Sequence, residues 1–229
     1  MILAKWSDLP PKMQNEEVRK YYEILKTRKL SLIAKRAFDI VVSLIMIILL
    51  LPFFLIFCIV IKLDSSGEII FKQKRVTKNG RIFKMLKFRT MVKDAPNLGP
   101  AITAQGDPRI TKSGKFLRKF RMDEIPQLFN ILRGDILFVG VRPEVESYVE
   151  CYTDEMLATL LMPAGVTSIT SILFKDEERL LKDSINPDKT YVEEILPIKM
   201  KHNLDYIKNF SFWSDIKIMI MTIFAVIKK

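Results

Sequence analysis

The chain has 229 residues, enough for one domain with a sizeable core and too few for two large ones. Its net charge of +11 indicates an anionic partner, and composition leaves nucleic acid, phospholipid head groups and phosphorylated substrates all open. A single histidine, His202, argues against a His-built metal site or a Ser-His triad, and two distant cysteines argue against a disulfide framework. Any catalysis is therefore expected to rest on carboxylates.

Residues 1–34 mix prolines, charges and a few apolar positions, and only the stretch from Glu16 to Leu30 is weakly helical. We expect these residues to form a surface arm. Trp6 and the basic side chains of this arm could lie on lipid, and a simple N-terminal extension fits equally well.

The segment from Ile40 to Ile61 contains no charged residue, and as one straight helix it would reach about 33 Å, enough to cross a bilayer core. Basic residues flank both of its ends, so the positive-inside bias is best satisfied if both ends stay on the cytoplasmic side. Pro52 lacks an amide hydrogen and supplies a kink where a re-entrant helix would need one. A kinked helix that spans the bilayer fits equally well. Asp39, near Arg36, is expected to pair or hydrogen-bond at the interface.

Two β-rich runs, residues 69–76 and 81–89, flank the sequence K-N-G, and Asn-Gly between such runs is typical of a β-hairpin. The predicted hairpin is strongly cationic. Period-two geometry places Lys87 and Arg89 on one face, where they could bind a diphosphate, and a solvated or lipid-facing strand is equally compatible.

A helix is predicted to begin at Asp123, which suits an N-cap, and to end at Gly134. Pro126 is tolerable in the first turn, and the apolar residues that follow recur at the spacing of one buried face. Asp123 and Glu124 would then lie at the positive end of the helix, which favours carboxylates and nearby phosphate groups. On spacing alone, a capped helix with no further role is the commoner interpretation.

The apolar stretch from Phe212 to Ile227 contains Asp215 and Lys217 and is too short to span a membrane, so an interfacial or core helix is expected there. The chain has no Walker or Rossmann glycine fingerprint. Phosphate binding is therefore expected to come from side chains and helix ends.

Several motifs resemble, in the same order, those of the bacterial sugar transferases called monotopic phosphoglycosyl transferases. The stretch R-M-D-E-I-P-Q-L-F-N-I-L-R-G-D-I-L-F-V-G-V-R-P-E, residues 121–144, resembles the family signature. K-R-A-F-D at 35–39 resembles the start of the family's membrane helix, and K-F-R-T-M at 87–91 its basic element. The chain departs from the family at Val141, where proline is usual, and at M-P-A-G-V-T-S, where Ala164 is inserted and a glycine is missing.

The resemblance covers roughly residues 30–229 and implies an α+β fold that is mainly helical with a small β-hairpin. It implies a monotopic membrane protein with interfacial amphipathic helices and an N-terminal re-entrant, Pro-kinked membrane helix over residues 35–62, which includes Arg36, Asp39 and Pro52. Residues 63–229 would form a membrane-associated catalytic domain on the cytoplasmic face of the bacterial inner membrane.

By resemblance, Asp123 is the nucleophile that attacks a UDP-sugar, releases UMP and forms a covalent phosphosugar intermediate, which polyprenyl (undecaprenyl) phosphate then attacks. Glu124 is expected to hold Mg²⁺ or to steer a phosphate. The implied partners are the two substrates and a phospholipid membrane, and no nucleic acid; the sugar and the oligomeric state stay open. The implied substrate-binding residues are Lys87, Arg89, Arg118, Arg142, Pro143 and Glu144.

Arg142 can give a bidentate contact to phosphate, and its alternative role is a surface ion pair with Glu144 or Glu146. Two other functions fit the same motifs. A membrane-bound hydrolase of nucleotide sugars would use the same basic groups and metal, with water as the acceptor. A non-catalytic membrane scaffold would need neither Asp123 nor Glu124, and the altered residues at Val141 and in the P-A-G-V-T-S turn favour it slightly.

Overall fold

The structure is a computed structural model that describes residues 3–95, 98, 107–174 and 186–227. Its N-terminal segment packs into the core and is not the surface arm that the sequence predicts. Asn15 caps helix α1 (Glu16–Thr27) by accepting a hydrogen bond from the Val18 amide at 2.9 Å. Val18 and Leu25 lie on one face of α1 and are fully buried, because this face packs against the 3-10 stretch η6 (Met156–Leu161) and helix α9 (Leu196–Lys208).

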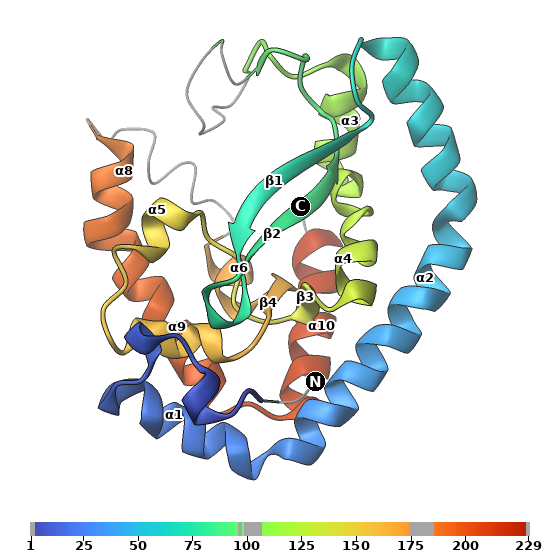
Figure 1. Ribbon diagram of the computed structural model, residues 1–229. Helices are drawn as coiled ribbons and strands as arrows, with labels where there is room; N and C mark the ends of the chain where they lie inside the picture. The colour runs from blue at the N-terminus through green and yellow to red at the C-terminus, as the bar shows by residue number, and fades with distance from the viewer. Residues whose placement is uncertain (1–2, 96–97, 99–106, 175–185, 228–229) are drawn as a thin grey trace.

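Helix α2 (Lys29–Asp64) continues without interruption through Pro52 and forms a long arc along one side of the molecule (Figure 1). Among the described helices, it is the one long and apolar enough to cross a membrane. The helix has no break at Pro52, and both the predicted kink there and re-entry into the membrane stay predictions. Residues on the inner side of α2 pack on the body of the protein: Met46, Ile47, Leu50, Phe54, Phe57 and Cys58. Large apolar residues on its other sides are exposed, among them Val41, Ile48, Leu49, Phe53, Ile59 and Leu63.

The predicted hairpin is confirmed. Strand β1 (Ile70–Val76) pairs antiparallel with β2 (Ile82–Phe88). The turn between them has Asn79 at φ 56° and Gly80 at φ 73°, and these left-handed conformations are the ones that Asn and Gly adopt at low cost.

Helix α3 (Lys112–Lys119), the 3-10 turn η5 (Met122–Glu124) and helix α4 (Gln127–Arg133) follow in order. The helix predicted from Asp123 therefore begins at Gln127. Pro126 has no amide hydrogen to donate to the Met122 carbonyl, which accepts from the Ile125 amide at 3.2 Å instead, so the residues before Pro126 form a tighter turn. Gly134, at φ 84°, ends α4 as predicted.

Two short parallel strands, which the sequence did not predict, lie beside α4: β3 (Ile136–Val139) and β4 (Ala164–Thr167). The backbones approach so closely beyond β3 that a Cβ at Gly165 would lie 2.1 Å from the Gly140 nitrogen. The altered P-A-G-V-T-S turn thus forms a strand whose first two residues are buried.

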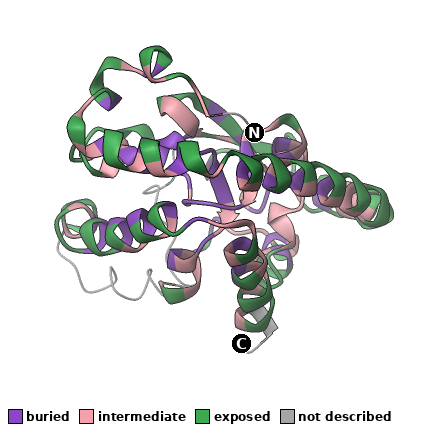
Figure 2. Ribbon diagram, turned by 90° about the horizontal axis from the view of Figure 1, so that it is seen from below, coloured by how far each residue is buried: buried purple, intermediate pink, exposed green. Residues whose placement is uncertain are grey.

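The C-terminal third contains helices α5 (Glu146–Val149), α6 (Ile169–Leu173), α8 (Pro187–Thr190), the π-helical turn η7 (Tyr191–Ile195) and α10 (Phe212–Ile227). The predicted C-terminal helix is confirmed as α10. It contacts α2, where Lys35 forms a buried ion pair with Asp215. Figure 2 shows exposed residues along the outer sides of α2 and α10 and buried residues toward the centre. The mainly helical α+β prediction is confirmed.

Candidate active site

Asp123 and Glu124 lie in the η5 turn, where the chain changes direction between α3 and α4. Arg121, directly before the turn, is held at φ 54° and ψ 24°, a left-handed conformation that costs a non-glycine residue about 1–2 kcal/mol. Sequence reasoning could not find this feature, because an arginine gives no signal for a left-handed residue. Strained residues of this kind often mark functional sites.

Lys87 and Arg142 both reach Glu124. The Lys87 Nζ lies 3.2 Å and the Arg142 Nη2 lies 3.6 Å from the same oxygen, Glu124 Oε1. Lys87 comes from the end of β2 and Arg142 from the loop after β3, so three segments that are distant in sequence meet here. Arg142 forms this contact in place of the surface pair with Glu144 or Glu146 that the sequence left open.

Arg118 completes the cationic surroundings of Asp123. Its Nε donates a hydrogen bond to the Thr90 hydroxyl at 2.8 Å, which fixes the guanidinium beside the turn. Burial raises the pKa of Asp123 above its ordinary value; Glu124 raises it further, while Lys87 and Arg118 oppose that shift. The carboxylate of Asp123 is thus less solvated than a surface carboxylate and depends on its cations to remain ionised.

Glu124 has the opposite balance. Burial alone would raise its pKa, but Arg142, Lys87 and Arg121 together outweigh burial and hold the pKa below its ordinary value. Burial in turn lowers the pKa of Lys87, and Glu124 opposes that change. The two adjacent carboxyl groups therefore differ in protonation behaviour, as expected where one group reacts and the other stays charged.

The structure does not bring Arg89 to the two carboxylates. Its buried guanidinium donates to the carbonyl of Ser65 at 2.6 Å, to that of Ile61 at 3.3 Å and to that of Glu68. These groups belong to the C-terminal end of α2 and the loop that follows it. Arg89 thus holds the end of α2 in place, and its phosphate contact stays a prediction.

The start of α2 contacts the C-terminal end of α4. Arg36 donates to the carbonyls of Ile131 at 2.6 Å and Leu132 at 2.8 Å in the last turn of α4, where the Ile131 carbonyl also accepts from the Gly134 amide at 2.9 Å. Asp39 is buried and its Oδ2 has no hydrogen-bond partner among the described residues, so the pairing expected of it stays a prediction. The helix that follows the η5 turn is therefore held by the predicted membrane helix.

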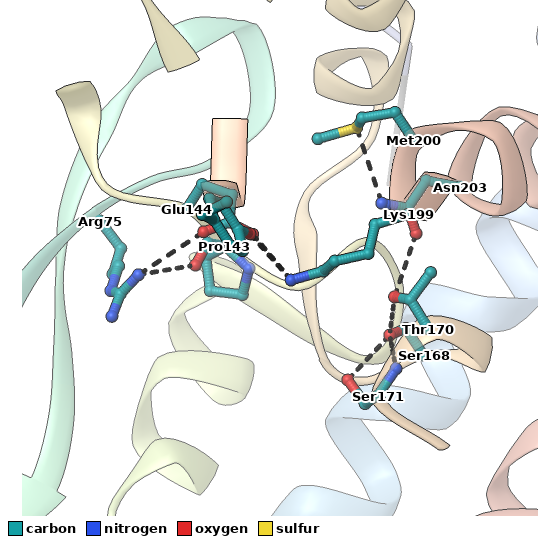
Figure 3. Close-up of polar contacts among 10 residues, drawn as sticks. Arg75, Pro143, Glu144, Ser168, Thr170, Ser171, Lys199, Met200 and Asn203 are labelled. Atoms are coloured by element: carbon teal, nitrogen blue, oxygen red, sulfur yellow. Dashed lines mark hydrogen bonds and ion pairs between the residues drawn. The ribbon is translucent and has the colours of Figure 1, made fainter. Parts of the chain in front are cut away.

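Pro143 and Glu144 lie in a polar network (Figure 3). The Arg75 Nη1 donates to the Pro143 carbonyl at 3.3 Å and lies 3.9 Å from the buried carboxylate of Glu144. The Tyr191 hydroxyl and the Lys199 ammonium reach the same carboxylate at 2.6 and 3.4 Å. Sequence reasoning missed Arg75, Tyr191 and Lys199, because Arg75 was one of many hairpin cations and the other two lie far along the chain.

Two adjacent carboxyl groups are too few for a metal site made by protein alone, and the described residues contain no group of three or more His, Cys, Asp or Glu side chains placed to hold a metal. The carboxyl groups of Asp123 and Glu124 nevertheless fit Mg²⁺, because this ion usually takes one or two carboxylates, several waters and the oxygens of a substrate phosphate. Both ion pairs of Glu124 involve Oε1, so Oε2 is the oxygen with which Glu124 would hold the ion.

Comparison with known proteins shows the family to which the chain belongs. The pattern of the family described as bacterial sugar transferase matches residues 30–229. The chain is 36% identical, over 82% of its length, to a UDP-N-acetylgalactosamine-undecaprenyl-phosphate N-acetylgalactosaminephosphotransferase of Aeromonas hydrophila, covering 42% of that protein. It is 34% identical, over 87% of its length, to an undecaprenyl-phosphate glucose phosphotransferase of Komagataeibacter xylinus, covering 37% of that protein.

A third relative is similar in length. The exopolysaccharide production protein ExoY of Sinorhizobium fredii is 32% identical over 85% of both chains. In contrast, the chain spans about two fifths of the length of the first two relatives.

Proposed function

Because the chain belongs to the bacterial sugar transferase family, we propose that it transfers a phosphosugar from a UDP-sugar to polyprenyl phosphate and releases UMP. The observation that carries the proposal is the η5 turn, where the half-buried Asp123 lies near Lys87 and Arg118, and the adjacent Glu124 pairs with Lys87 and Arg142. A turn with one poised carboxylate and three cations suits a reaction at an anionic phosphate. The names of the similar proteins, which refer to undecaprenyl phosphate, support the acceptor.

In the first step, an oxygen of the Asp123 carboxylate forms a bond to the β-phosphorus of the UDP-sugar. The bond from that phosphorus to the bridging oxygen breaks, and UMP leaves with the electron pair. In the second step, an oxygen of polyprenyl phosphate attacks the same phosphorus, and the Asp123 carboxylate leaves unchanged. The product is a polyprenyl diphosphate sugar, so one phosphoanhydride replaces another.

The surrounding residues make attack by an anion on an anion feasible. Lys87 and Arg118 stabilise the ionised form of Asp123 against burial. Arg142 is positioned by Glu124 to contact the diphosphate, whose charge must be neutralised as the bonds change. Glu124 would hold Mg²⁺ together with oxygens of the diphosphate, and the bound ion would supply further positive charge there.

We also propose that α2 is re-entrant, with the folded body on the cytoplasmic side of the membrane. Its first turns contact the body through Lys35 and Arg36, and its last turns contact the body through Asp64, whose carboxylate accepts from Ser113, and through Arg89. A helix that crossed the bilayer would place its two ends on opposite faces. One body that holds both ends supports a helix that enters and leaves on the same face.

Labelling of single cysteines tests this topology. With Cys58 and Cys151 replaced by serine, a cysteine at Lys29 and one at Leu63 should both react with an impermeant maleimide only after the cells are permeabilised. Reaction of either cysteine from outside intact cells would contradict the re-entrant arrangement.

UMP release from a panel of UDP-sugars, with Mg²⁺ and with or without undecaprenyl phosphate, tests the reaction. We expect turnover of one sugar that depends on the lipid, is lost in Asp123→Asn and is retained in Asp154→Asn, a change at an exposed carboxylate. Sugar phosphate released without lipid would indicate the hydrolase. No UMP from any donor would favour the scaffold.

A further inference from the structure

The carboxylate of Glu144 is the centre of a buried polar network that joins distant parts of the chain. Its Oε1 accepts a hydrogen bond from the Tyr191 hydroxyl at 2.6 Å and one from the Lys199 ammonium at 3.4 Å. Its Oε2 lies 3.9 Å from the Arg75 Nη1. Figure 3 shows Arg75 and Lys199 approaching Glu144 from opposite sides.

The hydrogen bonds within this network have a fixed direction. The Lys199 ammonium, which can only donate, donates to the Tyr191 hydroxyl at 2.8 Å. The hydroxyl hydrogen of Tyr191 is then directed at Glu144. Lys199 therefore acts on Glu144 both directly and through Tyr191.

The same network fixes the backbone on the C-terminal side of Arg142. The Pro143 carbonyl accepts from Arg75 at 3.3 Å, and the Glu144 carbonyl accepts from the Val76 amide at 2.9 Å. Two consecutive residues after Arg142 are thus bound to strand β1. The Arg142 side chain points from this loop toward Glu124, with its Nη2 3.6 Å from Glu124 Oε1. Its direction therefore depends on the contacts that hold the next two residues.

Each buried charge in the network has a partner of opposite charge. Lys199 and Glu144 are both buried, and an ammonium or carboxylate buried without a partner costs several kcal/mol. Arg75 and Arg142 are close enough that Arg142 contributes to the lowered pKa of Arg75, after burial, while Glu144 opposes the shift. Glu144 therefore offsets a repulsion that would move Arg142 away from the β1 side of the loop.

We propose that Lys199 and Tyr191 are positioning residues that hold Glu144 and so direct the Arg142 guanidinium at the diphosphate of the donor. This inference rests on the proposed function of Arg142. It assigns a part in the reaction to α9 and η7, which lie far along the chain from Asp123. Helix α9 is itself held by Asn203, which accepts a hydrogen bond from Thr170 at 3.3 Å (Figure 3).

A double-mutant cycle on the full-length protein tests the proposal with UMP release as the readout. Lys199→Met removes the ammonium at similar volume and should lower kcat/KM for the UDP-sugar by about ten- to a hundredfold, because small displacements of a binding group have effects of this size. In an Arg142→Met background the same change should have almost no further effect. Lys201→Met, an exposed lysine on the same helix, is the control and should retain wild-type activity.

A structural role alone would give a different result. If Lys199→Met lowers activity by the same factor in both backgrounds, or leaves wild-type activity unchanged, the proposal is wrong. Should Lys199→Met fail to fold, as judged by thermal unfolding, Tyr191→Phe completes the same cycle with an expected loss of about three- to tenfold. A wild-type protein without UMP release would overturn the proposed function and this inference together, whereas an active wild type with an additive cycle would overturn only the inference.

Discussion

Two carboxylates, Glu124 and Glu144, are both paired with cations, but their surroundings differ in access to solvent. The side chains that pair with Glu124, those of Lys87 and Arg142, are 19% and 37% exposed. Those that pair with Glu144, from Lys199 and Arg75, are 6% and 21% exposed. The Glu124 cluster is the more open of the two, because Arg142 is the most exposed of these four cations and could exchange its protein partner for a phosphate oxygen. Lys199 is the least exposed of the four, and the cluster around Glu144 fixes the loop after Arg142.

The largest effect is expected at Asp123, inside the open cluster. Asp123→Asn should lower turnover by about 10⁴-fold or more, because an amide cannot form the covalent intermediate. Mass spectrometry of protein mixed with UDP-sugar but no lipid should find the phosphosugar on the peptide that contains Asp123, and not in the variant. A modification found on Glu124 would reverse the roles given to the two carboxylates.

The two clusters should respond differently to loss of their central charge. Glu144→Gln leaves Lys199 buried without its anion and should lower the free energy of unfolding by about 3–5 kcal/mol. Glu124→Gln should lower it less, by about 1 kcal/mol, since Arg142, its more exposed partner, can turn toward solvent. Urea and thermal unfolding in the same detergent measure both. Equal losses in the two variants would show that the clusters do not differ as described.

The pKa of Asp123 should move in opposite directions in two variants. Lys87→Met removes a cation that lowers this pKa, so the pKa should rise and the acidic limb of the pH–rate profile should move to higher pH. Glu124→Gln removes an anion that raises it, so the pKa should fall. Activity is lost as pH falls through the pKa, because the nucleophile must be ionised.

Carbon-13 NMR of labelled aspartate measures this pKa even where a variant is inactive. Lys87→Met should also reduce turnover by about 10²–10³-fold, the usual cost of removing a group that stabilises developing charge. Lys84→Met, an exposed lysine of the same strand, is the matched control and should leave both quantities unchanged. A shift of the same sign in Lys87→Met and Glu124→Gln would contradict the assigned charges.

The smallest effect is expected at Arg121, at the edge of the open cluster. Glycine adopts the left-handed conformation without strain, so Arg121→Gly should be more stable than Arg121→Ala by about 1 kcal/mol. Thermal unfolding of the two variants compares them directly. If alanine proves equal or better, the left-handed turn before Asp123 is not a source of strain.

Local signals in the sequence predicted much of the fold near the site. Asn79 and Gly80 specified the hairpin turn, and Gly134 the end of α4. The motifs singled out Asp123, Glu124, Lys87, Arg118 and Arg142, which the structure brings together, although their roles stay predictions. These successes share a cause: each depends on a turn residue or on a short motif.

The failures depend on contacts between residues far apart in the chain. Tyr191 and Lys199 lie 47 and 55 residues from Glu144, so no local pattern could pair them. Strand periodicity predicted Arg89 on the same face as Lys87. In the structure its guanidinium instead donates hydrogen bonds to carbonyls at and just after the end of α2. The strands β3 and β4 have four residues each, too few for a periodic signal. In α1 the many charged residues made the segment look like a surface arm, although Val18, Tyr22 and Leu25 form one face that tertiary packing buries.

Helix α2 is part of the folded core and not a separable tether. Ile61 of α2 is buried in one cluster with Phe88 and Leu117, and Arg36 donates hydrogen bonds to two carbonyls in the last turn of α4. A shortened protein without residues 29–64 would expose Phe88 and Leu117. It would also lose the Arg36 guanidinium that bonds the last turn of α4. Folding of the body and insertion into lipid are therefore expected to occur as one cooperative event, and a water-soluble fragment should not retain the geometry of the catalytic turn.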